Sequence, residues 1–296
     1  MDRFQEMQTF CAVVDAGSFV KTADALHMSK SAVSRYVADL EARLGVRLLH
    51  RTTRRLSLTE EGAVFNTRCR EILSGLDEAE SEVSSRSGAA RGLLRVNVPV
   101  SFGIQTLAPL WNAFHELHPQ VRLDIELSDR VVDVVEEGYD LAIRIAILSS
   151  SSLISKRLAS TRIVLCASPG YLNKYGQPSN PANLAKHKVI GYSYWMGGDA
   201  WEFDGPEGPV NVKIHPWMST NNGDTCRAVA LAHQGIILQP TFLVGDDLAT
   251  GRLVEILPEY RSIDLGIYAV YPTRKHVAPK VRALVNFLEE KLSELE

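Results

Sequence analysis

The residues with the most specific chemistry are short polar and cationic side chains near the start of the chain. Lys30, Ser31, Ser34 and Arg35 would share one face of a helix. Hydroxyl, ammonium and guanidinium groups donate hydrogen bonds to the base edges and phosphates of DNA. The chemistry that this face indicates is recognition of a nucleic acid.

Two short helices must position that face. Ser18 can cap a helix over 19–27, and Ser29 can cap a second helix after a tight turn. The second helix carries an apolar stripe opposite the polar face, formed by Val33, Val37, Leu40 and Leu44. This order is typical of a helix-turn-helix, whose second helix lies in the DNA major groove. The alternative is an ordinary helical hairpin with a solvated face.

The flanking residues favour the first interpretation. A third helix is predicted from apolar residues at helical spacing: Phe4, Met7, Cys11 and Val14. Behind the pair, no acid lies between Glu41 and Glu60, whereas basic residues are frequent: Arg43, Arg47, His50, Arg51, Arg54 and Arg55. Such a cluster is expected where a protein contacts phosphates, although charge runs are also common on solvated surfaces. Segments 46–49 and 56–58 predict a hairpin, or wing, around the turn 51–55.

One long helix is predicted from Thr59 onward. Thr59 can cap it, and Glu60 and Glu61 suit its positive end. Apolar residues then alternate steps of four and three: Phe65, Cys69, Ile72, Leu76, Ala79 and Val83. This heptad seam predicts a partner helix and therefore a dimer, although packing on the chain's own C-terminal domain is the alternative. The glycines and serines of 84–92 predict a hinge.

The remainder of the chain alternates β-rich runs with helical patterns, which is typical of a parallel α/β sheet. The predicted strands are 93–98, 121–127, 140–145, 162–167, 189–192, 200–203, 210–214, 235–239 and 265–270. The predicted helices are 102–118, 131–137, 169–175, 224–233 and 279–295.

Several segments of the chain resemble those of a known family. FVKTADALHMSKSAVSRYVADLEARLGVRLLHRTTRRLSLTEEG, from Phe19 to Gly62, is similar to the winged helix-turn-helix of LysR-type transcriptional regulators. LRVNVPVSFG, ELSDRVVDVVEEGYDLAIRIA, CASPGYL and IYAVYP resemble the family's effector-binding domain. The resemblance implies that the face Lys30–Arg35 contacts DNA and that Arg54 lies in the wing. Many members carry Gln and a small residue or proline where this chain has Lys30-Ser31, so base preference does not carry over.

The resemblance also implies a domain order. The expected fold is α/β overall, with an N-terminal winged helix-turn-helix, a long linker helix and a two-lobed periplasmic-binding-protein-like α/β effector domain. We expect the DNA-binding domain over 1–58, the dimerisation helix and hinge over 59–90, and the effector-binding domain over 91–296. Lobe I would take about 91–161 and 264–296, and lobe II about 162–263.

The candidate effector site follows from the predicted sheet. Ligands of open α/β sheets lie beyond the carboxyl ends of the strands, where helix N-termini favour anions. The residues expected there are Ser101, Phe102, Ser128, Arg144, Asn221, Asn222 and Gln239. Simple helix caps and a structural ion pair of Arg144 are the alternatives. The predicted effector is a small anion bound between the lobes.

Composition is consistent with these expectations. The chain has 296 residues and a formal net charge of −3, with its basic cluster confined to the N-terminal region. No apolar run reaches membrane-spanning length, and MDRFQEMQTF lacks the apolar core of a signal peptide, so we expect a cytoplasmic protein. The cysteines are widely spread and form no C-x-x-C pair, which indicates neither disulfides nor zinc: Cys11, Cys69, Cys166 and Cys226.

No catalytic pattern is present. The chain lacks a Gly-x-x-x-x-Gly-Lys loop, a Gly-x-Gly-x-x-Gly turn and a His-Glu-x-x-His helix, and we expect HELH at 115–118 to face solvent. We therefore predict no enzyme activity, cofactor, catalytic residue or metal. The predicted function is a sequence-specific DNA-binding transcriptional regulator controlled by its effector. The alternatives are an enzyme or a solute-binding receptor on a bilobal α/β scaffold, and the receptor would need a secretory signal.

The expected partners follow from that function. They are double-stranded DNA with a palindromic operator, a small anionic effector, a second copy of the chain or a dimer of dimers, and RNA polymerase. No membrane partner is expected.

Overall fold

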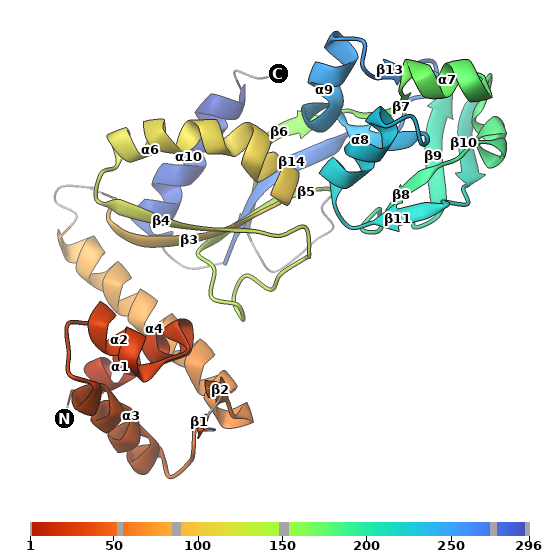
Figure 1. Ribbon diagram of the computed structural model, residues 1–296. Coiled ribbons are helices and arrows are strands. Elements are labelled where there is room, and N and C mark those ends of the chain that lie inside the picture. Colours follow the sequence, from red (N-terminus) through yellow and green to blue (C-terminus); the bar gives the residue numbers. More distant parts are fainter. Residues whose placement is uncertain (1, 52–55, 85–89, 148–153, 273–276, 294–296) are drawn as a thin grey trace. The chain divides into compact units, whose positions relative to one another are not determined.

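The computed structural model describes residues 2–51, 56–84, 90–147, 154–272 and 277–293. The chain divides into two compact units, which are described separately (Figure 1). The first holds Met1–Ala89 with Val135–Gly138, and the second holds Ala90–Val134 with Tyr139–Glu296. No helix in the described ranges is both long and apolar enough to cross a membrane.

The first unit begins with three helices and a hairpin. These are α1 (Arg3–Ala16), α2 (Phe19–Ala25), α3 (Lys30–Leu44), β1 (Leu49–Arg51) and β2 (Leu56–Leu58). Ser29 begins α3, because its hydroxyl accepts the Ala32 amide at 3.1 Å. Gly45 ends α3 with a φ of 73°, a conformation that glycine adopts without steric cost. The helix-turn-helix predicted from sequence is thus confirmed as a structure.

A small core fixes the orientation of α3. Val33, Val37 and Leu40 are completely buried and pack with Phe10 and Val13 of α1. The expected stripe is therefore the inner face of α3, and the polar residues occupy its outer face. Strand β1 pairs antiparallel with β2 and begins three residues later than the sequence indicated.

The long helix α4 (Glu60–Ser84) follows directly. The Thr59 hydroxyl accepts the Gly62 amide at 2.9 Å and donates to the Arg47 carbonyl at 2.8 Å. A Cβ at position 62 would lie 2.0 Å from the Leu48 carbonyl oxygen. Only glycine allows the helix to start this close to the wing.

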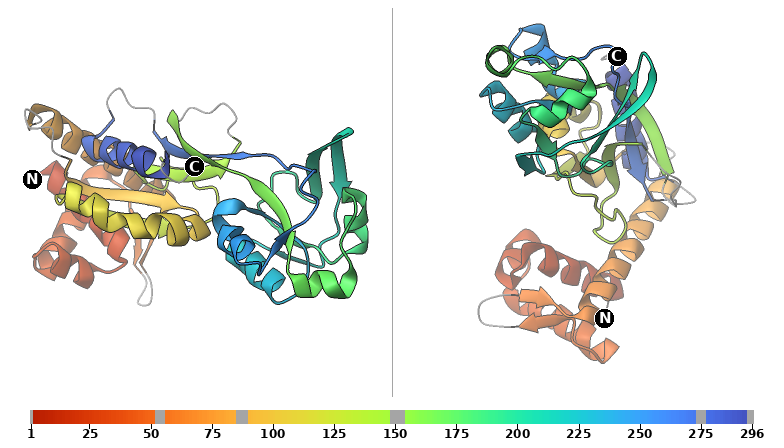
Figure 2. Two further views of the ribbon diagram at one scale, coloured as in Figure 1. Left: turned by 90° about the horizontal axis from the view of Figure 1, so that it is seen from above. Right: turned by 90° about the vertical axis from the view of Figure 1, so that its right-hand side faces the viewer.

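The first lobe of the second unit is built on a five-stranded sheet in the order β4-β3-β5-β14-β6. Its strands are β3 (Gly92–Val98), β4 (Val121–Leu127), β5 (Leu141–Ala146), β6 (Ile154–Thr161) and β14 (Leu265–Tyr271). Strand β14 is antiparallel to both neighbours, so the sheet is mixed where the sequence predicted a parallel one. Helices α6 (Trp111–Leu117) and α10 (Pro279–Ser293) run along it (Figure 2) and meet through Phe114 and Phe287.

Two predicted helices of this lobe differ from expectation. The helix predicted over 102–118 is divided into α5 (Val100–Phe102), η2 (Gly103–Leu107), η3 (Ala108–Leu110) and α6. Pro109 lacks an amide hydrogen and disfavours a continuous α-helix there. The helix predicted over 131–137 is wrong, because residues 131–133 have no regular structure and residues 134–138 form turns. Valines at 131, 132, 134 and 135 are β-branched, which lowers helix propensity.

The second lobe contains three small sheets. Its strands are β7 (Ile163–Ala167), β8 (Ile190–Tyr192), β9 (Ala200–Gly205), β10 (Gly208–Lys213), β11 (Met218–Thr220), β12 (Ile237–Pro240) and β13 (Val254–Glu255). Its helices are α7 (Pro169–Tyr175), η4 (Pro181–Lys186), α8 (Gly223–Leu231) and α9 (Thr241–Ala249). The sequence did not predict β6, β11, β13 or α9.

The chain passes between the lobes in extended segments. Strand β6 ends at Thr161 in the first lobe, and β7 begins at Ile163 in the second. Strand β14 begins at Leu265 and returns the chain to the first sheet. This two-lobed α/β fold agrees with the class that the sequence predicted.

Candidate functional site

The outer face of α3 is open to solvent. Lys30, Ser31 and Arg35 are exposed, and Ser34 is half-buried. The Ser31 hydroxyl lies 2.9 Å from the hydroxyl of the cap residue Ser29, which ties it to the start of the helix. The face therefore presents cationic and hydroxyl groups from the N-terminal half of α3, the part that enters the major groove in helix-turn-helix proteins.

The basic cluster behind α3 serves more than one purpose. Arg43 donates from Nη2 to a carboxylate oxygen of the buried Glu6 at 2.7 Å, so it holds α3 to α1. Arg47 lies 3.8 Å from Glu41 but is largely exposed. Arg51 belongs to β1, and Arg54 and Arg55 lie outside the described residues. Sequence reasoning missed the role of Arg43 because Glu6 is far away in the chain.

The structure corrects the expected dimerisation seam in the N-terminal half of α4, where the apolar side chains pack within their own chain. Cys69 is completely buried in the core of the first unit, and Phe65 packs against Phe10 with ring centroids 5.9 Å apart. These two side chains therefore stabilise their own domain, because that core lies against the start of α4. Ile72 is 48% exposed and Leu76 is half-buried. The side chains of Ala79 and Val83 lie outside what the structure describes.

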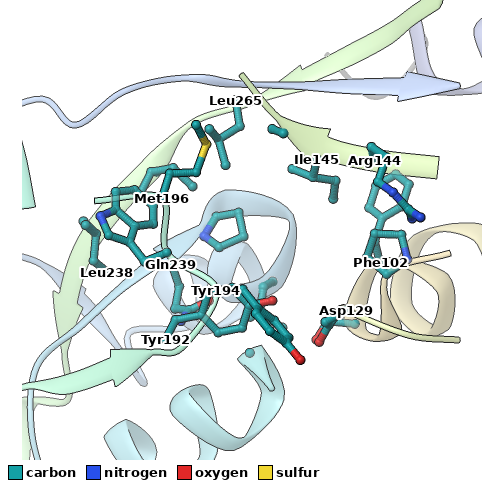
Figure 3. Close-up of a pocket in the computed structure, with 18 of the residues that line it drawn as sticks. Phe102, Asp129, Arg144, Ile145, Tyr192, Tyr194, Met196, Leu238, Gln239 and Leu265 are labelled. Carbon is teal, nitrogen blue, oxygen red and sulfur yellow. The ribbon is translucent and has the colours of Figure 1, made fainter. Parts of the chain in front are cut away.

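The second unit holds a cavity of about 450 Å³ between its two lobes (Figure 3). The structure brings together Ser101, Phe102, Ser128, Arg144 and Gln239 in its walls. Asn221 and Asn222 do not line it. The Asn222 side chain instead accepts the Thr225 amide at 2.9 Å and caps α8.

Most of the cavity wall is apolar or aromatic. Phe102 and Ile145 lie on one side, with Met196 and Leu238 opposite (Figure 3). Leu265 of β14 also lines the cavity. Further apolar and aromatic lining residues are Val131, Ile147, Ile163, Tyr192, Tyr194, Trp195, Phe242, Leu243 and Ile263. A cavity of this size and character suits a small organic molecule with an apolar body.

Three polar or charged side chains of the cavity wall make hydrogen bonds within the chain. The Ser101 hydroxyl donates to the Asp224 carboxylate at 2.6 Å, and Arg144 Nη1 donates to Asn97 Oδ1 at 2.9 Å. The Asp129 carboxylate accepts the Val100 amide at 2.9 Å, while its burial raises its pKa above the ordinary value. Asp129 and Asp224 were not identified from the sequence as residues of the site. Asp129 directly follows Ser128 of the expected site, and Asp224 directly follows Gly223, the first residue of α8.

All four cysteines are buried. Burial raises the pKa of Cys226 to about 11, and it raises the pKa of Cys166 as well. Both of these thiols are therefore protonated near neutral pH, as expected of structural cysteines.

A winged helix-turn-helix with an open polar face, followed by a bilobal α/β domain with an apolar cavity, defines a ligand-responsive DNA-binding protein. Residues 4–63 match the bacterial regulatory helix-turn-helix protein, lysR family, and residues 87–293 match the LysR substrate binding domain. The chain belongs to the LysR family of DNA-binding transcriptional regulators, whose C-terminal domain binds effectors.

Two relatives and one solved structure extend over nearly the whole chain. The regulator CrgA of Neisseria meningitidis is 37% identical over 289 residues, covering 97% of this chain and 96% of its own length. A helix-turn-helix-type transcriptional regulator of Xanthomonas campestris is 36% identical over 297 residues, covering 96% and 84%. The structure of CrgA, also from Neisseria meningitidis, superposes with a TM-score of 0.64 at 36% identity and covers 97% of this chain and 98% of its own.

Arg43 and Arg47 of the basic cluster should differ in how much they contribute to the stability of the domain. Arg43→Ala leaves the Glu6 carboxylate, which is 2% exposed, without its cationic partner, so the free energy of unfolding should fall by about 1–3 kcal/mol. Arg47→Ala removes an exposed cation and should cost less than about 1 kcal/mol. Urea denaturation of both variants measures the difference. Equal losses would show that the Arg43–Glu6 pair does not stabilise the domain.

Proposed function

We propose that the exposed face of α3 reads base edges in the major groove of a palindromic operator. The observation that carries this proposal is that exposed Lys30, Ser31 and Arg35 share the outer face of α3 with half-buried Ser34, opposite the buried stripe of the same helix. Arg51, Arg54 and Arg55 of the wing would neutralise phosphates, because guanidinium groups bind phosphate oxygens strongly. Within this proposal, residues 1–58 form the DNA-binding domain.

We propose further that α4 pairs with the same helix of a second copy. Exposed Ile72 and half-buried Leu76 continue the heptad beyond Phe65 and Cys69, and the sequence extends it to Ala79 and Val83. Pairing would hold two α3 helices at the separation of two half-sites. Residues 59–90 then form the dimerisation helix and hinge, and two dimers could associate.

The effector domain, residues 91–296, would control this DNA binding. Its cavity supports a small-molecule effector, lined by Ser101, Phe102, Ser128, Arg144 and Gln239. A ligand shifts the balance between two arrangements only if it prefers one of them. The protein would act without catalysis in the cytoplasm, where operator DNA and RNA polymerase are accessible.

The first test addresses base readout. DNA fragments that the protein retains at moderate salt are sequenced, and the selected operator is compared with a scrambled duplex. Arg35→Ala should reduce the discrimination between them by about 1–3 kcal/mol, because a bidentate base contact is lost. Arg122→Ala, which removes the same charge from an exposed position on β4, should leave discrimination unchanged. Full discrimination by Arg35→Ala would exclude this side chain from readout.

The second test addresses the dimer. Ile72→Asp with Leu76→Asp places charges in an apolar interface, so the dimer dissociation constant should rise by roughly a hundredfold or more. Val64→Asp is the matched control, because Val64 lies on the same helix, off the seam, and is 63% exposed. Analytical ultracentrifugation measures both. An unchanged dissociation constant in the double variant would assign the interface to another surface.

The third test addresses the cavity. A thermal-shift screen of small metabolites on the full chain should find compounds that stabilise it, by about 2.7 kcal/mol at a hundred times the dissociation constant. Ala146→Trp fills the cavity and should abolish the shift, whereas Ala249→Trp lies outside the cavity lining and should retain it. Compounds that still stabilise Ala146→Trp fully would place the effector site elsewhere.

A further inference from the structure

A carboxylate that belongs to the protein lies directly behind the wall of the cavity. Asp224 lies in the first turn of α8 in the second lobe. Its two carboxylate oxygens accept hydrogen bonds from the Ser101 hydroxyl at 2.6 Å and the Gln105 amide at 2.8 Å, both in the first lobe. Asp224 thereby links the lobes immediately behind Ser101 and Gly223, which line the cavity.

This arrangement weakens the recognition of an anionic ligand at Ser101 and at the start of α8. The Ser101 side chain is 7% exposed, and its one hydroxyl hydrogen is already donated to Asp224. The positive end of α8 is balanced by the same carboxylate, and Asn222 caps the helix. A ligand carboxylate placed against Ser101 would face Asp224 without a donor between them, which is unfavourable for two like charges.

The charged residues of the cavity wall do not restore a preference for anions. Asp129 and Glu202 balance Arg130 and Arg144 in formal charge, and Asp224 adds one further negative charge behind the wall. Arg144 donates from Nη1 to Asn97 Oδ1 and to the Ile143 carbonyl, both at 2.9 Å. Arg130 also interacts within the chain. Nη1 of Arg144 is therefore already engaged with the protein.

We propose that the effector is an uncharged molecule with an apolar body, and that Asp224 is the specificity-determining residue that excludes carboxylates. This inference rests on the proposed effector role of the cavity. It replaces the small anion expected from the sequence, because the Ser101 hydroxyl on which that expectation depended already donates to Asp224, and the same carboxylate balances the positive end of α8. The apolar and aromatic walls supply the binding surface, and a neutral hydrogen-bonding group suits the polar end.

Phenylacetamide and phenylacetate are suitable probes, because they share a ring and size and differ in charge. Titration calorimetry with the full chain should give tighter binding of the amide to the wild type by about tenfold or more. Asp224→Asn removes the negative charge with little change in shape, so it should strengthen phenylacetate binding and reduce this ratio at least fivefold. Asp224→Ser should shift the ratio in the same direction, which keeps the test valid if one variant folds poorly.

Asp246→Asn is the matched control, since Asp246 is an exposed acid on α9 and does not line the cavity. It should leave the ratio unchanged. The inference is overturned if phenylacetate binds the wild type as tightly as the amide, if both Asp224 variants keep the wild-type ratio, or if the amide does not bind. Carboxylic acids found by the metabolite screen and lost in Ala146→Trp would overturn this inference alone and leave the proposed function standing. Metabolite hits that persist in Ala146→Trp would instead contradict the proposed function.

Discussion

The DNA-binding unit depends on one buried carboxylate. Glu41, near the end of α3, accepts the backbone amides of Leu48 and Leu49 at 2.9 and 3.2 Å, so the wing cannot turn independently of α3. The residues that it fixes also contact the start of α4, through the Arg47 carbonyl and Thr59. A short path of hydrogen bonds therefore joins α3, the wing and α4 into one body.

This connection determines how firmly α4 holds α3. A helix that pairs with a second copy can set the spacing of two α3 helices only if the connection between them is stiff. Gly62 contributes to this stiffness, because the Leu48 carbonyl occupies the space where a side chain would begin. In the effector domain the lobes are joined by two extended crossings, by the Asp224 link and by packing of Phe102 against Phe242, whose ring centroids are 5.1 Å apart. Stiffness of the first unit suits transmission of a ligand signal to α3.

Local patterns predicted the features that depend on neighbouring residues. Ser29, the apolar stripe of α3, the Thr59 cap and most strands were predicted correctly, because caps and periodicity act within a few residues. Long-range partners were not predictable in this way. The contact of Arg43 with Glu6 and that of Ser101 with Asp224 join residues that are distant in sequence, and both changed the interpretation of a predicted site. The antiparallel direction of β14 likewise depends on where the chain returns.

The apolar residues of helix α4 have two roles, one in the core of its own chain and one in the proposed dimer. This division determines how DNA binding would depend on the concentration of the protein. Its first turns complete a core within one chain, through Phe65 and Cys69, before the exposed Ile72 is reached. Under the proposed pairing, dilution would release monomers whose DNA-binding fold is already complete. Occupancy of a two-half-site operator would then rise with the square of the monomer concentration, so the cellular level of the protein becomes a regulatory input alongside its effector.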